Sequence, residues 1–90
     1  MVEAVYDIPG RRRLSFGGFA DLMLSNGYKL VERRRDFQEF RDGETNVKYK
    51  SHNGLGRFSS VTITINGDRG VIAQLERLMG ISSAKQNLPN

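Results

Sequence analysis

The 90-residue chain has no cysteine and no tryptophan, and only two prolines and one histidine. Without cysteine it has neither a disulfide framework nor thiolate ligands for a metal ion, so an intracellular protein is expected. No apolar run approaches the roughly 20 residues of a membrane-spanning helix. Residues 1–7 lack the basic segment and apolar run of a secretory signal. We therefore expect a soluble, cytoplasmic protein with no membrane association and no metal site.

The length of the chain limits what it can enclose. A domain of 90 residues buries only about 60–65% of the surface that its unfolded chain exposes. One thin core leaves little room for a large cofactor, and we expect none. Residues 1–81 read as a single domain, and the polar residues 82–90 read as a flexible C-terminal tail.

Apolar periodicity indicates both strands and helices. Alternation of apolar and polar residues, or a short apolar run beside a turn signal, predicts strands at 2–8, 28–31, 37–40, 47–50 and 61–65. Apolar residues spaced three and four apart predict helices at 16–26 and 69–79. The strand at 2–8 has a disordered arm as its alternative.

The predicted helices carry recognisable end signals. Ser15 and Asp68 are suitable N-caps of the first and second helix. Asn26-Gly27 is expected to end the first helix, and Gly80 with Ile81 fits a Schellman motif at the end of the second. Asp42-Gly43 is a turn signal between strands.

The order of these elements predicts an α+β fold. We expect an antiparallel sheet of three to four strands, with a possible extra N-terminal strand and with two helices packed on one face. The other face, which carries Lys48, Lys50, Thr62 and Thr64 between the apolar positions, should stay uncovered.

Positive charge is concentrated rather than abundant. Fourteen Lys and Arg against ten Asp and Glu give a net charge of +4, which many soluble domains carry without binding nucleic acid. The candidate nucleic-acid-binding residues are Arg11, Arg12, Arg13, Arg33, Arg34, Arg35, Lys48, Lys50 and Arg57. Arginine forks onto phosphate and carboxylate groups more specifically than lysine does. Solvated charge without a function remains the alternative.

The triplet Arg33-Arg34-Arg35 is the most informative cluster. On a strand, Arg33 and Arg35 would point to one face and Arg34 to the other. All three avoid burial only if the strand is at an edge of the sheet or ends there, which would offer an exposed row of guanidinium groups. The alternative is that the charges protect an edge strand from aggregation.

His52 is the only histidine and hence the only weak candidate for catalysis near neutral pH. It lies in a glycine-rich loop, where a solvent-exposed residue without a role is favoured over a contact with nucleic acid or a catalytic group. The segment 42–53 fails the calcium-loop pattern, because Val47 stands where glycine is required and Asn53 where glutamate is required. No glycine pair fits a phosphate-binding loop, so nucleotide hydrolysis is not expected.

Three segments resemble the HicA (YcfA-like) family of mRNA interferase toxins. They are Leu24-Ser25-Asn26-Gly27-Tyr28-Lys29-Leu30-Val31, Phe40-Arg41-Asp42-Gly43 and the helix from Gly70 to Ile81. The resemblance covers about residues 15–81. It implies a small double-stranded-RNA-binding-like (dsRBD-like) domain of order α-β-β-β-α, in which a histidine on the second strand cleaves mRNA.

This chain departs from that pattern at the catalytic position. Where the family carries glycine-serine-histidine, the sequence reads Arg35-Asp36-Phe37-Gln38, and the histidine position falls on Phe37. We therefore expect a non-catalytic module that binds nucleic acid, RNA before DNA. The alternatives are a module that binds an acidic protein surface as an inhibitor or regulator of nucleic-acid-handling machinery, and a HicA-like ribonuclease using His52. The sequence does not give the oligomeric state.

Overall fold

A computed structural model describes residues 1–10, 14–52 and 59–81, and the backbone of 85–87. Along the chain the elements are β1 (Val2–Ile8), α1 (Phe16–Ser25), β2 (Lys29–Arg34), β3 (Phe37–Asp42), β4 (Thr45–Ser51), β5 (Val61–Gly67), α2 (Arg69–Met79) and β6 (Lys85–Asn87). No helix among these residues is long and apolar enough to cross a membrane.

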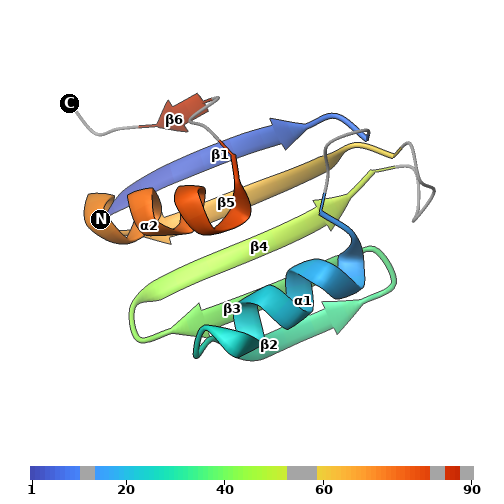
Figure 1. The fold of residues 1–90 in the computed structure, drawn as a ribbon, viewed down its shortest axis with the longest axis horizontal. Helices are drawn as coiled ribbons and strands as arrows, with labels where there is room; N and C mark the ends of the chain where they lie inside the picture. Colours follow the sequence, from blue (N-terminus) through green and yellow to red (C-terminus); the bar gives the residue numbers. More distant parts are fainter. Residues whose placement is uncertain (11–13, 53–58, 82–84, 88–90) are drawn as a thin grey trace.

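The described strands form one antiparallel sheet in the order β2-β3-β4-β5-β1-β6. Both helices lie on the same face of this sheet, α1 over β2 and β3 and α2 over β5 and β1 (Figure 1). The α+β class and the two helices on one face are confirmed. The possible extra N-terminal strand is present, since β1 pairs along its whole length with β5, and β6 adds a strand that was not expected on the other side of β1.

The core lies between the sheet and the helices. Alternate residues of β1, β3, β4 and β5 are buried there, and their largest fully buried members include Tyr6, Phe40, Tyr49 and Ile63. α1 adds Phe19, whose ring centroid is 4.7 Å from that of Tyr49. Strict alternation is what buries one face of a strand and leaves the other in water. Most apolar residues of these strands thus face the helices.

The helix ends follow local chemistry, with one difference from expectation. The Ser15 hydroxyl accepts a hydrogen bond from the Gly18 amide, which caps α1 as predicted. Asp68 occupies the N-cap position of α2 but makes no side-chain capping bond. At the other end Gly80 and Ile81 donate to the carbonyls of Arg77 and Glu76, which is the predicted Schellman motif.

The tail was expected to be flexible along 82–90. Lys85–Asn87 instead forms β6, paired with Glu3 to Val5 of β1. This pairing satisfies backbone groups that β1 would otherwise expose at the edge of the sheet. Residues 82–84 and 88–90 lie outside the described part of the chain.

Candidate functional site

The face of the sheet opposite the helices carries the candidate site. The strand registers place its side chains in three rows that cross the sheet. The rows are Arg34, Phe37, Lys50, Thr62 and Asp7; Glu32, Glu39, Lys48, Thr64 and Val5; and Lys29, Arg41, Asn46, Asn66 and Glu3. No helix of the described chain covers this surface, which is therefore open to a partner (Figure 1).

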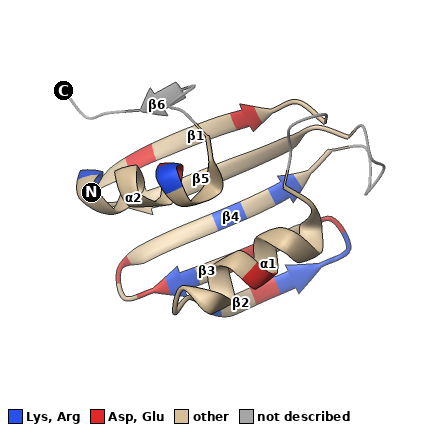
Figure 2. Cartoon of the chain, viewed as in Figure 1, with Lys and Arg blue, Asp and Glu red and all other residues tan. Residues whose placement is uncertain are grey.

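Charge is unevenly distributed over this open face. The strands β2, β3 and β4 hold two carboxylates, Glu32 and Glu39, against five cations, Lys29, Arg34, Arg41, Lys48 and Lys50, and Asp36 in the turn from β2 to β3 pairs with Lys50. We call these five cations, together with Phe37, the basic face. β5 contributes neutral polar residues, and β1 contributes Glu3 and Asp7 (Figure 2). The half of the open face formed by β2, β3 and β4 therefore carries a surplus of positive charge.

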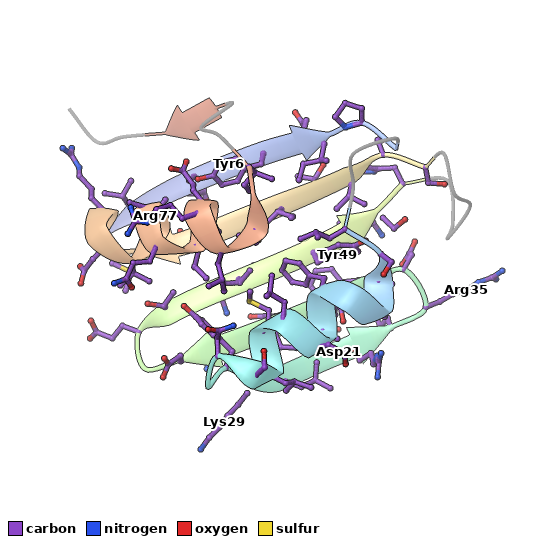
Figure 3. The ribbon with its side chains drawn as sticks, in the orientation of Figure 1. Tyr6, Asp21, Lys29, Arg35, Tyr49 and Arg77 are labelled. Carbon is purple, nitrogen blue, oxygen red and sulfur yellow. The ribbon has the colours of Figure 1, made fainter. Side chains whose placement is uncertain are left out.

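The arginine triplet does not form the expected row of guanidinium groups. Arg33 points to the helix side, where its Cζ lies 5.3 Å from the centroid of the Phe16 ring. Arg34 points to the open face, with its Cζ 4.6 Å from the centroid of Phe37. Arg35 follows the end of β2 in the turn to β3 and extends away from the domain (Figure 3). Strand alternation and the end of β2 at Arg34 separate the three side chains, and only Arg34 joins the basic face.

Other sequence predictions have mixed outcomes. β2 is an edge strand, which is one of the two positions predicted from the three consecutive arginines. Lys48 and Lys50 lie on the open face, on the strand next to β3. Arg11, Arg12, Arg13 and Arg57 lie outside the described residues, so the structure does not test them.

The side chains that form ion pairs on the basic face are exposed, apart from that of Glu39, which is 14% exposed. Arg34 Nε is 2.7 Å from Glu32 Oε2, Arg41 is 3.9 Å from Glu39, and Lys50 is 3.3 Å from Asp36. Solvent-exposed pairs of this kind contribute about 0–1 kcal/mol. Lys29 and Lys48 make no ion pair within the described part of the chain. The cations can therefore exchange carboxylate or water for phosphate at little cost.

His52 is held by hydrogen bonds to residues that are not its neighbours in the sequence. Its backbone N–H donates to the Ser60 carbonyl at 2.9 Å, and its Nε2 is 2.7 Å from Thr62 Oγ1. The Thr62 hydroxyl donates to Asp7 Oδ1 at 3.0 Å. With its proton directed at Asp7, the Thr62 oxygen accepts from Nε2–H, which leaves the Nδ1 lone pair of His52 as the basic position.

Sequence reasoning missed several members of this surface. Phe37 was considered only as the position of a lost histidine, and Lys29 and Arg41 were not singled out. Thr62 and Asp7 are distant in the sequence and meet only because β1 pairs with β5. The alternation of β3 placed Phe37 and Arg41 on one face, but no local pattern identified which strands lie beside it.

The helix side has a groove of different character. A hollow of about 550 Å³ is bordered by the end of α1 and by one side of α2, and its lining includes Tyr28, Asp42, Arg77 and Leu78. Burial, and secondarily the carboxylate of Asp42, raise the pKa of the Tyr28 hydroxyl above its ordinary value of 10.0. Tyr28 is thus a neutral hydroxyl at physiological pH. Within the described residues, no group of three or more His, Asp or Glu side chains could hold a metal ion.

Comparisons of the chain with protein-family models, with curated proteins and with solved structures found no match. The likeness to HicA toxins thus remains a prediction from short motifs.

Proposed function

We propose that this protein is a non-catalytic RNA-binding module that contacts phosphates through its basic face. The observation that carries the proposal is the surplus of cations on the uncovered surface of β2, β3 and β4, where five Lys and Arg side chains accompany two carboxylates on the strands and Asp36 in the adjoining turn. Lys and Arg on a surface of this kind bind the nucleic-acid backbone without reading its sequence.

The arrangement of the cations suits a chain of phosphates better than a single anion. Arg34 and Lys50 occupy the same row on either side of Phe37. Lys48 lies two residues before Lys50 on the same face of β4. Adjacent strands are about 4.8 Å apart and alternate residues of a strand about 6.8 Å apart. Successive positive groups are therefore spread over a surface instead of converging on one point.

Salt-dependent binding of a labelled RNA, followed by fluorescence anisotropy, tests this proposal. Each neutralised phosphate contributes about −0.7 to the slope of log K against log salt concentration for a single strand. The double variant Lys48→Ala/Lys50→Ala should bind more weakly at low salt and lose about 1.4 of that slope. The matched control Arg69→Ala/Arg77→Ala removes the same charge from α2 on the helix side and should retain binding.

Two results would contradict the proposal. Absence of RNA binding at low salt would refute it and would favour an acidic protein as the partner instead. Equal weakening by the two double variants would show that net charge, and not the basic face, determines affinity. Circular dichroism of each variant checks that it remains folded.

A second candidate function, RNA cleavage, is favoured specifically by the hydrogen bonds from His52 to Thr62 and from Thr62 to Asp7. In this reaction the free Nδ1 of His52 accepts the proton of a ribose 2′-hydroxyl as that oxygen attacks the adjacent phosphorus. The bond from phosphorus to the 5′-oxygen breaks, and the leaving oxygen takes a proton from water. Lys50, the cross-strand partner of Thr62, is placed to attract the phosphate.

Incubation of RNA with wild-type protein, His52→Gln and Thr62→Val tests this candidate. Cleavage by wild type that His52→Gln abolishes and Thr62→Val weakens would support it. Intact RNA in all three samples, or equal cleavage by all three, would exclude a catalytic His52.

A further inference from the structure

We infer that the basic face binds RNA as a single strand, with one base stacked on the guanidinium group of Arg34, which Phe37 supports from below. This inference depends on the proposed RNA-binding function and specifies its substrate class. Three features of the open face carry it: the position of the Phe37 ring, the plane of Arg34 above it, and the neighbouring lysines.

Phe37 is an aromatic residue on the solvent side of the sheet. It is the first residue of β3 and half-buried, while the next residue, Gln38, is fully buried on the helix side. Its cross-strand partners are Arg34 on β2 and Lys50 on β4. The fully paired backbone of β3 therefore holds an aromatic ring between two cations on an uncovered surface.

Arg34 converts that ring into a larger platform. Its guanidinium carbon lies 4.6 Å from the ring centroid, within the range of a cation–π interaction. Its Nε lies 2.7 Å from Glu32 Oε2, and 65% of its side chain stays exposed. The side of the guanidinium group that faces away from Phe37 is therefore open to solvent. Bases of single-stranded RNA stack on such arginine planes as well as on aromatic rings.

The lysines supply the backbone contacts that a stacked base requires. Lys50 lies directly beside Phe37 in the first row, and Lys48 lies in the second. Thr62 and Thr64 continue these rows on β5 with half-buried hydroxyl-bearing side chains. A strand whose base rests on Arg34 therefore has its phosphates beside ammonium groups and its sugar edges beside hydroxyls.

This geometry favours a single strand over a duplex. In a duplex both faces of each internal base are covered by its neighbours, and proteins read such RNA through phosphates and 2′-hydroxyls. A duplex would therefore gain from the lysines but not from the stack of Arg34 on Phe37. Stacking on protein side chains is the usual device of proteins that bind single strands.

Dissociation constants for one RNA sequence as a single strand, as a duplex and as the equivalent single-stranded DNA test the inference. The variants are Phe37→Leu, which keeps an apolar side chain on β3, and Arg34→Lys, which keeps the charge but removes the plane. Each should weaken single-stranded RNA binding by about 5- to 100-fold. Neither should change the salt slope or the affinity for duplex RNA by a comparable amount.

The outcomes separate this inference from the proposed function. If Lys48→Ala/Lys50→Ala weakens RNA binding while Phe37→Leu and Arg34→Lys bind single-stranded RNA like wild type, the stacking platform is refuted and the RNA-binding function stands. Tighter binding of the duplex, or of single-stranded DNA, overturns the assignment to single-stranded RNA. Absence of binding to every nucleic acid at low salt overturns both proposals.

Discussion

The end of α2 offers a test in which two identical chemical changes have opposite effects. Gly80 has φ 68° and ψ 28°, the left-handed conformation that ends the helix. An L-residue in that conformation costs about 1–2 kcal/mol. A Cβ at Gly80 would meet no atom within 4 Å, so this cost is a backbone effect without a steric clash. We expect Gly80→Ala to lower the free energy of unfolding by about 1–2 kcal/mol.

Gly70, in the first turn of the same helix, is the matched control. A Cβ there also meets no atom within 4 Å, but the backbone is helical and its φ is not positive. Alanine in a helix is favoured over glycine by up to about 1 kcal/mol, so Gly70→Ala should be neutral or stabilising.

Urea and thermal denaturation, each followed by circular dichroism, measure both effects. In a domain of this size, 1 kcal/mol corresponds to a shift of about 4–8 °C in Tm. Gly80→Ala should therefore melt several degrees below wild type, and Gly70→Ala at or above the wild-type temperature. Equal midpoints for Gly80→Ala and wild type, or an equal loss in both variants, would refute the assignment of Gly80 as the helix-terminating residue.

Three further predictions concern the elements that support the open face. Ser15→Ala should lower the free energy of unfolding by about 1 kcal/mol because it removes the α1 cap. Ser25→Ala, which removes a bond to a carbonyl of its own helix and a 3.5 Å bond from the Asn26 side chain, both exposed, should not, and equal losses in urea denaturation would contradict this. Because the pKa of Tyr28 is raised in the folded protein, its hydroxyl keeps its proton at pH values where the unfolded chain loses it. The free energy of unfolding should therefore fall as pH rises above 10.0, and the urea midpoint of Tyr28→Phe should fall less steeply than that of wild type over this range. A Cβ at Gly67 would approach the Thr45 side chain at 3.2 Å, so Gly67→Ala should lower the free energy of unfolding. Adding Thr45→Ala should restore part of that loss, and a double-mutant cycle with no coupling would disprove the contact.

Local chemistry in the sequence was sufficient to locate most elements. Val61, Ile63 and Ile65 alternate with polar residues, and all three are fully buried on β5. Ser15 caps α1, and Gly80 with Ile81 closes α2 as predicted. These features depend on residues within one turn or one strand, and such interactions are encoded by neighbouring positions.

The neighbours of each strand were not predictable in the same way. Alternation fixes which residues share a face, but it does not fix strand order or register. The placement of Thr62 between Lys50 and Asp7 follows from β5 pairing with both β4 and β1, which are far apart in the sequence. Consequently the sequence indicates only that His52 lies in a glycine-rich loop. It does not identify the hydroxyl of Thr62, which contacts His52, or the carboxylate of Asp7, which accepts from that hydroxyl.

The order of the strands also separates the two interpretations of the positive charge. Edge protection explains cations on β2, since charged side chains on an edge strand discourage pairing with another chain, and a register shift near Val31 serves the same purpose. It does not explain Arg41, Lys48 and Lys50, because β3 and β4 are interior strands whose backbones are already paired on both sides. Cations on interior strands prevent no edge-to-edge contact. They are accounted for by a solvated face or by an anionic ligand, and the surplus of cations over carboxylates on β2, β3 and β4 favours the ligand, because a merely solvated face gains nothing from an excess of one charge.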